Sequence, residues 1–224
     1  MPLDTLEETL AHELSDLYSA ENQFAKALQQ TVKNADSETV KNMAQEHHAE
    51  TLAQIENLKQ AFVSLGKKPE RGLVCKAAQG LVEEGSSTLK EEKPKGLIKD
   101  TVLLGSSLRI EHYEIAGYTA AISLAKSLGK REVVALLQIN LKQEQATAKR
   151  IEAATIELLK SASAPVATKD LSMKTATPKT AAKPAAKGAK VPSISAASKV
   201  AISVAEQNGV PKNKKSSSSK KSKK

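Results

Sequence analysis

The amino-acid sequence predicts an all-α protein: an antiparallel four-helix bundle followed by a disordered basic tail. Aromatic residues make up only 2% of the chain and tryptophan is absent, while alanine, leucine, lysine and glutamate are abundant, which favours helices over a β-sandwich. Apolar residues recur at alternating steps of three and four in four long segments, the spacing of a buried helix face. Short turns join the first segment to the second and the third to the fourth, so we expect two helical hairpins.

The first helix is predicted over residues 5–33. Asp4 precedes it and Glu7 follows three residues later, which is a signal for a helix start. The apolar face of this helix is interrupted once, by Glu21.

The second helix is predicted to begin at Ser37 and to end at Gly66, a residue type that commonly terminates helices. Its buried face contains three consecutive polar positions, which are His47, Glu50 and Gln54. Such a run of polar residues on a buried face needs partners.

A longer connection over residues 67–96 is predicted to contain a short helix at about 73–92. The third helix follows over residues 97–128, and the fourth over residues 131–159. The connection is long enough to cross over between two hairpins, whereas Gly129 marks a tight turn within the second hairpin.

Four carboxylates interrupt the apolar faces of the four long helices: Glu21, Glu50, Glu111 and Glu144. A single one could reach solvent from a slightly rotated helix. In each hairpin, however, the two carboxylates lie at nearly equal distances from the turn, which places them at similar depth at about 1.5 Å per residue. Four buried anions would repel one another without a cation, so the pattern favours a metal site.

Two further residues share these faces, since His47 lies three residues before Glu50 and Glu114 lies three residues after Glu111. One glutamate from each of two helices, plus a glutamate with a second ligand three residues away on the other two, is the pattern of dinuclear carboxylate bundles. We therefore expect two metal ions, iron first, with manganese or zinc as alternatives. The predicted ligands are Glu21, His47, Glu50, Glu111, Glu114 and Glu144. Tyr18, Gln54 and His112 are expected beside the ligands rather than among them.

Residues 3–160 resemble the ferritin-like metal-binding stress proteins of the YciE/YciF type. The resemblance rests on LSDLYSAE at 14–21, HHAETLAQ at 47–54, GLVEE at 80–84 and EHYEIA at 111–116. It implies a ferritin-like four-helix bundle, a homodimer and a link to stress responses, without a settled biochemical activity. The sequence departs from the expected pattern at Ala148, where an acid one turn beyond Glu144 would be expected. The fourth helix is thus left with one clear ligand.

The domain organisation predicted is a bundle at residues 1–160 and a tail at residues 161–224. The tail contains 14 lysines, no arginine and two acidic residues, whereas the preceding part has 20 basic and 23 acidic residues. A flexible lysine-rich chain can bind nucleic acid without sequence preference, although it could also serve only to keep the protein soluble. The lysines expected to contact nucleic acid are Lys183, Lys187, Lys190, Lys212, Lys214, Lys215, Lys220, Lys221, Lys223 and Lys224.

The single cysteine excludes an intramolecular disulfide, and neither a signal peptide nor an apolar stretch long enough for a membrane span is recognised. We expect a cytoplasmic protein without a membrane partner, associated with the nucleoid if the tail binds DNA. Two functions are open. The first is a di-metal centre that oxidises iron or consumes peroxide, with a separate reductase. The second is a non-enzymatic, DNA-associated scaffold with a structural or vestigial metal site.

Overall fold

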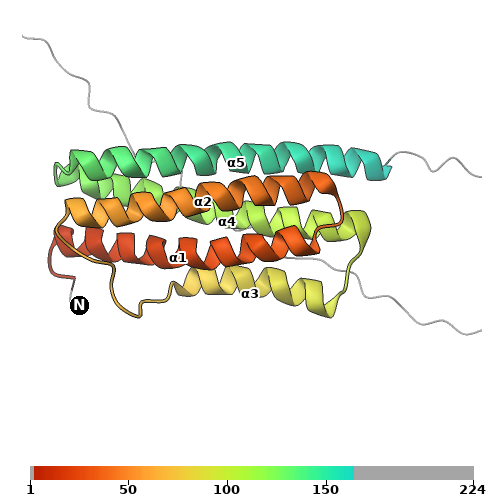
Figure 1. Cartoon of the computed structure of the whole chain (residues 1–224), viewed down its shortest axis with the longest axis horizontal. Helices are drawn as coiled ribbons and strands as arrows, with labels where there is room; N and C mark the ends of the chain where they lie inside the picture. Colours follow the sequence, from red (N-terminus) through yellow and green to blue (C-terminus); the bar gives the residue numbers. More distant parts are fainter. Residues whose placement is uncertain (1–2, 164–224) are drawn as a thin grey trace, which may run out of the picture. The chain divides into compact units, whose positions relative to one another are not determined.

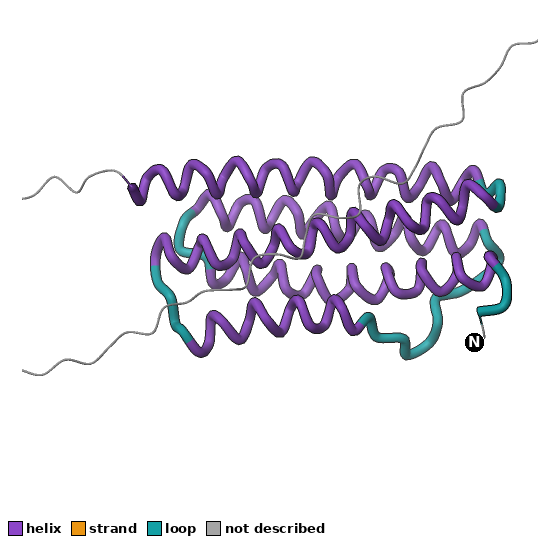
Figure 2. Tube along the Cα trace, turned by 180° about the vertical axis from the view of Figure 1, so that it is seen from behind, coloured by secondary structure: helices purple, strands orange, loops and turns teal. Residues whose placement is uncertain are grey.

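The computed structural model describes residues 3–163, which form five α-helices and, within that range, no strand (Figures 1 and 2). The helices are α1 (Leu6–Asn34), α2 (Glu38–Ser64), α3 (Lys76–Glu91), α4 (Gly96–Ser127) and α5 (Arg131–Ser163). The predicted all-α class and the four long helices are confirmed. The tail lysines predicted to contact nucleic acid lie outside the described residues.

The four long helices form an antiparallel bundle in which α1 packs on α2 and α4, and α5 packs on α2 and α4. The short helix α3, which follows α2 and precedes α4 in the chain, runs back along the outside of the bundle and lies against α1 and α4 (Figure 1). It is the predicted crossover helix, and it brings the chain to the end of the bundle where α4 begins. None of the helices at residues 3–163 is long and apolar enough to cross a membrane.

The helix ends follow from local capping. The first helix begins one residue later than the Asp4 cap predicts, because Thr5 is the N-cap: its hydroxyl accepts a hydrogen bond from the Glu8 amide, and the Glu8 carboxylate accepts one from the Thr5 amide. Ser37 caps α2 as predicted, with its hydroxyl accepting from the Val40 amide. Gly66 follows α2 at a φ of +63°, a conformation that glycine adopts without strain.

Asp100 joins the two hairpins, whose relative height the sequence alone leaves open. It is buried at the start of α4, and its two carboxylate oxygens accept hydrogen bonds of 2.8 Å from the backbone amides of Asp36 and Ser37. Those amides belong to the turn between α1 and α2. One side chain thus ties the first hairpin to the second near the end of the bundle.

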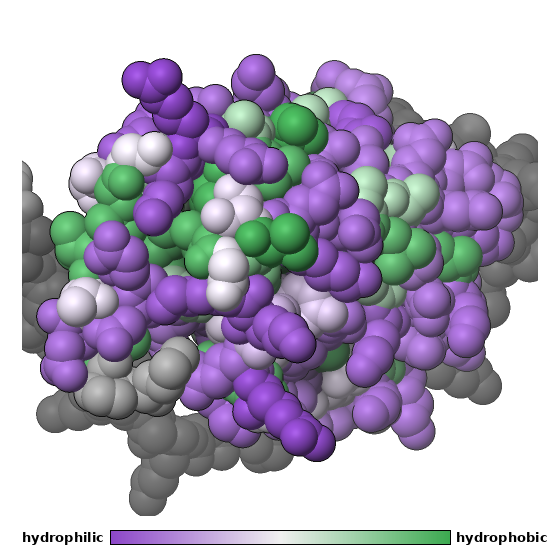
Figure 3. All heavy atoms as spheres, turned by 60° about the vertical axis from the view of Figure 1, so that its left-hand side comes forward, coloured by the Kyte–Doolittle hydropathy of each residue, from purple (hydrophilic) through white to green (hydrophobic). Residues whose placement is uncertain are grey.

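The core contains three apolar clusters, and the polar layer lies between two of them, while the third joins α1 to α3. Of the two that flank the layer, one lies toward the start of α1 and includes Leu14, Phe62 and Leu137, whereas the other lies toward the opposite end and includes Val40 and Leu104. Outside, the face seen in Figure 3 is largely hydrophilic with apolar side chains interspersed, as expected for amphipathic helices. The polar layer is therefore enclosed by apolar packing above and below.

Candidate metal centre

Four carboxylates and one imidazole occupy the buried polar layer. Glu21 comes from α1, His47 from α2, Glu111 and Glu114 from α4, and Glu144 from α5, and none of them is more than 4% exposed. The matched depths predicted from the sequence thus bring residues from all four long helices into one layer.

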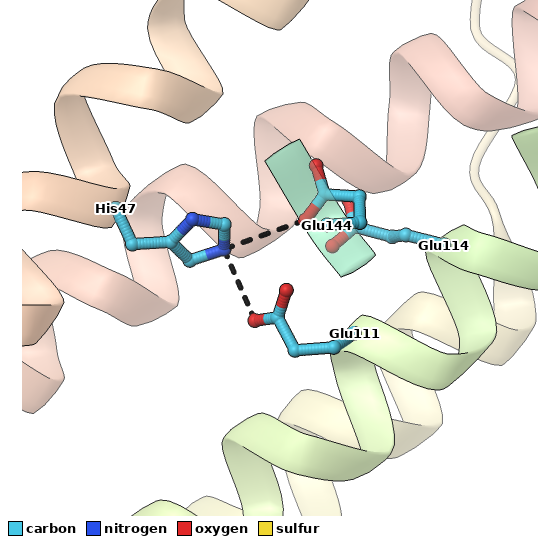
Figure 4. A group of neighbouring side chains, drawn as sticks. All are labelled: His47, Glu111, Glu114 and Glu144. Carbon is cyan, nitrogen blue, oxygen red and sulfur yellow. Dashed lines mark ion pairs between the residues drawn. The ribbon is translucent and has the colours of Figure 1, made fainter. Parts of the chain in front are cut away.

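Four of these side chains point toward one common volume (Figure 4). His47, Glu111, Glu114 and Glu144 each offer one ligand atom, and these atoms all lie within 4.8 Å of one another. His47 Nε2 lies 3.1 Å from Glu111 Oε1 and 3.8 Å from Glu144 Oε2. This spacing places two or more potential ligands around a position that one ion could occupy.

Glu21 belongs to the same layer and is held by α4. Its Oε1 accepts a hydrogen bond from the hydroxyl of Tyr118, and that hydroxyl accepts one of 3.0 Å from Asn140 Nδ2. Asn140 Nδ2 also donates to the backbone carbonyl of Gln54, whose Nε2 donates to Glu144 Oε1. Two of the carboxylates are therefore oriented by neutral hydrogen-bond donors, an arrangement common around metal ligands.

Each of the four buried carboxylates has one oxygen atom that accepts no hydrogen bond within residues 3–163. Glu21 Oε2, Glu111 Oε2, Glu114 Oε1 and Glu144 Oε2 are all buried without a hydrogen-bond partner among the described residues. Buried polar atoms are normally paired, so four such oxygens in one layer indicate a missing positive partner. Carboxylate oxygens with one imidazole nitrogen suit iron, manganese or zinc, and the residues present therefore fit a metal ion.

The pKa values of these residues reflect the burial of several ionisable groups in one layer. Burial raises the pKa of Glu21 to about 7, and burial together with neighbouring carboxylates raises the pKa of Glu114 and of Glu144 well above the ordinary value. Burial works to lower the pKa of His47, but hydrogen bonds to Glu111 and Glu50 outweigh it and raise this pKa to about 10. In the absence of a metal, the layer would thus hold protons that a bound cation would displace.

The other predicted residues lie farther out. Glu50 touches the outer edge of His47, with its Oε2 3.4 Å from His47 Nδ1, and it pairs with Arg150 at 2.8 Å. Tyr18 is half-buried against the apolar cluster near the start of α1. His112 is exposed on the outside of α4. The structure therefore brings together five of the six predicted ligands and places Glu50 behind one of them.

Three contributors were missed by the sequence reasoning: Asn140, Thr147 and Arg150. Asn140 and Thr147 are buried polar residues four before and three after Glu144 on α5, so helical spacing could have placed both on the buried face. No such signal exists for Arg150, because an arginine at the edge of a helix face is ordinary and its partner Glu50 lies on another helix.

His47 also borders two small cavities, each with a volume of about 20 Å³. The first is walled by apolar side chains of all four long helices, including Leu28, Met43 and Leu104, and the second includes Glu111. A cavity of this size has room for one water-sized molecule. Small molecules can thus be held next to the imidazole and the carboxylates.

Comparison with known proteins shows the family to which the chain belongs. Residues 5–164 match the domain of unknown function DUF892. Protein YciF of Escherichia coli K12 is 35% identical over 147 residues, which cover 66% of this chain and 88% of YciF. The crystal structure of YciF, described as a stress protein, matches with a TM-score of 0.67 at 34% identity and covers 70% of this chain and 98% of that one.

Two other solved structures are similar. The YcfI protein of Rhodopseudomonas palustris matches with a TM-score of 0.64 at 35% identity, over 67% of this chain and 94% of that chain. A dodecameric thioferritin of Bacteroides fragilis matches with a TM-score of 0.53 over 70% of this chain and 92% of that one, and at 14% identity this likeness shows the ferritin-like fold alone. The chain therefore belongs to the DUF892 family, the ferritin-like proteins of the YciE/YciF type.

Proposed function

We propose that the buried layer is a metal centre, with iron as the first candidate and manganese or zinc as alternatives, and that the protein oxidises iron or consumes peroxide under stress. The observation that carries the proposal is a set of four buried carboxylate oxygens that accept no hydrogen bond from the described part of the chain and lie in one layer with His47. The description of E. coli YciF as a stress protein supports the physiological setting. Bound iron would supply electron exchange with peroxide or oxygen, and a separate reductase would return electrons.

The chain's own residues have defined tasks in this proposal. His47 and the carboxylates of Glu111, Glu114 and Glu144 hold the ion, with Glu21 as a further ligand. The Tyr118 hydroxyl donates a hydrogen bond to Glu21 Oε1 and orients this carboxylate toward the ion. Each of the small cavities next to His47 has room for one water-sized molecule.

Metal content with an optical spectrum of aerobically purified protein tests the proposal. We expect bound metal in the wild type and its loss in Glu111→Ala, because this change removes a buried ligand that lies 3.1 Å from His47 Nε2. Glu152→Ala is the matched control, since Glu152 is exposed on α5. Equal and negligible metal in the wild type and Glu111→Ala would contradict the proposal, as would equal loading of both.

A second candidate function is a non-enzymatic DNA-associated scaffold with a structural metal, favoured by the charge of the tail. Residues 161–224 contain 14 lysines and only two acidic residues. The tail could therefore neutralise phosphates and bind duplex DNA in a salt-dependent way. A gel shift of the full chain and of a chain ending at residue 160 tests it. Failure of the full chain to bind DNA at low salt would contradict it.

We also propose that the protein is a cytoplasmic homodimer, associated with the nucleoid through its tail. Apolar side chains exposed on the bundle support self-association, because Leu52 and Val63 on α2 and Ile139 on α5 are 52%, 78% and 50% exposed. Light scattering of the purified chain should give twice the chain mass. A monomer at micromolar concentration would contradict the dimer without affecting the metal centre.

A further inference from the structure

Glu50 was expected to be a ligand, but its environment differs from that of the other carboxylates. Three donors converge on its Oε2: Arg150 Nη2 at 2.8 Å, Thr147 Oγ1 at 3.3 Å and His47 Nδ1 at 3.4 Å. The Glu50 side chain is also 31% exposed, whereas the five residues of the buried layer are nearly inaccessible. This oxygen is already satisfied by the chain itself.

His47 is oriented by this contact. One ring nitrogen, Nδ1, faces Glu50, while the other, Nε2, faces Glu111 and Glu144. Metal-bound histidines commonly donate their second N–H to a carboxylate, which sets the tautomer and the ring angle. Glu50 has the position of that second partner, with the ion on the Nε2 side.

Beyond Glu144, α5 offers no second anion to the buried layer. The residue three positions after Glu144, on the same side of the helix, is the neutral Thr147. Ala148, one turn beyond Glu144, offers no ligand atom either. Arg150 instead extends from α5 to Glu50, and Nη2 of Arg150 also donates to Thr147 Oγ1 at 2.8 Å.

We propose that this centre binds one metal ion and that the guanidinium of Arg150 takes the place of a second. Arg150 anchors Glu50, and Glu50 orients His47 so that Nε2 faces the ion. Both are positioning residues rather than ligands. A second divalent cation at Glu50 would have to displace the guanidinium or lie beside its positive charge, and both are unfavourable. The inference rests on the proposed function of the layer as a metal centre.

The test counts ions and measures affinity, using full-length protein freed of metal by a chelator and titrated with Co²⁺ without oxygen. Equilibrium dialysis with elemental analysis gives the stoichiometry, and the visible Co²⁺ absorption reports ligand geometry. We expect one Co²⁺ per chain in the wild type. No bound ion would contradict the proposed function itself, whereas two ions per chain would overturn only this inference.

Variants test the positioning role separately. Glu50→Gln should retain one ion but raise its Kd by about 10- to 100-fold, the usual effect of losing an outer partner of a ligand. Glu46→Gln is the matched control, because Glu46 is an exposed carboxylate 3.5 Å from Arg150 Nη1, and its Kd should not change. If Glu50→Gln bound Co²⁺ as tightly as the wild type, the positioning role would be wrong.

The double variant Thr147→Glu, Arg150→Gln restores an anion on α5 and removes the guanidinium. We expect it to bind two Co²⁺ per chain. If it still binds one, Arg150 is not what excludes the second ion and the proposal fails. Should Glu50→Gln not fold, as judged by its helical circular dichroism, Arg150→Gln carries the affinity test, because it releases Glu50 while leaving every proposed ligand in place.

Discussion

At the scale of single residues, neutral donors decide how the carboxylates of the buried layer are oriented. Tyr118 and Asn140 form a chain of hydrogen bonds that ends on Glu21, and Gln54 donates to Glu144. These donors lower the cost of burying an anion without neutralising it. The carboxylates are thus held in place for a cation that displaces their protons.

Tyr118→Phe removes the donor to Glu21 while keeping the ring in the core. Because the Tyr118 hydrogen bond lowers the pKa of Glu21, its loss should raise that pKa further and weaken metal binding. It also leaves Asn140 Nδ2 without this acceptor, so we expect the free energy of unfolding to fall by about 1–3 kcal/mol. Urea unfolding of the metal-free protein measures the change.

Tyr113→Phe is the control for this prediction. The Tyr113 hydroxyl donates to Asp16 and contacts Cys75, outside the buried layer. It should leave the metal affinity unchanged, and an equal loss of affinity in both variants would indicate a general effect on packing instead.

At the scale of helices, the register between the two hairpins determines whether carboxylates from α1 and α4 meet. Asp100 contributes to this register by accepting hydrogen bonds from the amides of Asp36 and Ser37. Charge-assisted hydrogen bonds of this kind are among the stronger polar contacts. The contact of Asp100 with the turn thus adds to the Tyr118–Glu21 hydrogen bond in joining α1 to α4.

Asp100→Asn should weaken this connection, because an amide has one acceptor oxygen where the carboxylate has two. One backbone amide of the turn loses its partner, and we expect a loss of about 1–3 kcal/mol in the free energy of unfolding. Chemical denaturation measures it, with the exposed Glu152→Gln as the control. Unchanged stability in Asp100→Asn would show that the turn finds another acceptor.

At the scale of the whole molecule, the buried layer makes the stability of the metal-free protein depend on pH. The pKa of Glu21 rises from 4.5 to about 7 on folding, so the folded state binds more protons than the unfolded chain in this interval. Its contribution is present below pH 4.5 and is lost as the pH rises through 7, by about 3 kcal/mol. The pKa of His47, raised from 6.5 to about 10, extends the loss to higher pH.

We therefore expect the metal-free protein to become less stable as the pH increases from 5 to 9, measured by urea unfolding. Glu21→Gln should flatten the part of the curve between pH 4.5 and 7, because the variant has no proton to lose there. Bound metal should reverse the trend, since ligand deprotonation favours binding at higher pH. Stability that rises with pH in the metal-free wild type would contradict this prediction.

Much of the fold follows from the sequence alone. The alternation of three and four residues between apolar positions predicts four long helices, because only that spacing puts a continuous apolar stripe on one side of a helix. The differences are local. Thr5 replaces Asp4 as the first cap, α3 begins at Lys76 rather than near 73, and α5 continues to Ser163 instead of ending near 159. The exact ends of a helix depend on single capping hydrogen bonds, which the spacing of the apolar residues does not predict.

The sequence by itself determined the helices and the similar depth of the two carboxylates within each hairpin, and five of the six ligands that it predicts meet in the structure. Only the tertiary structure decided the role of Glu50, because its partner Arg150 lies 100 residues away on α5. The tertiary structure also decided that Asp100 joins the hairpins. Periodicity specifies which face of a helix is buried, but which polar atoms meet across helices depends on the height and rotation of each helix, and these are set by packing.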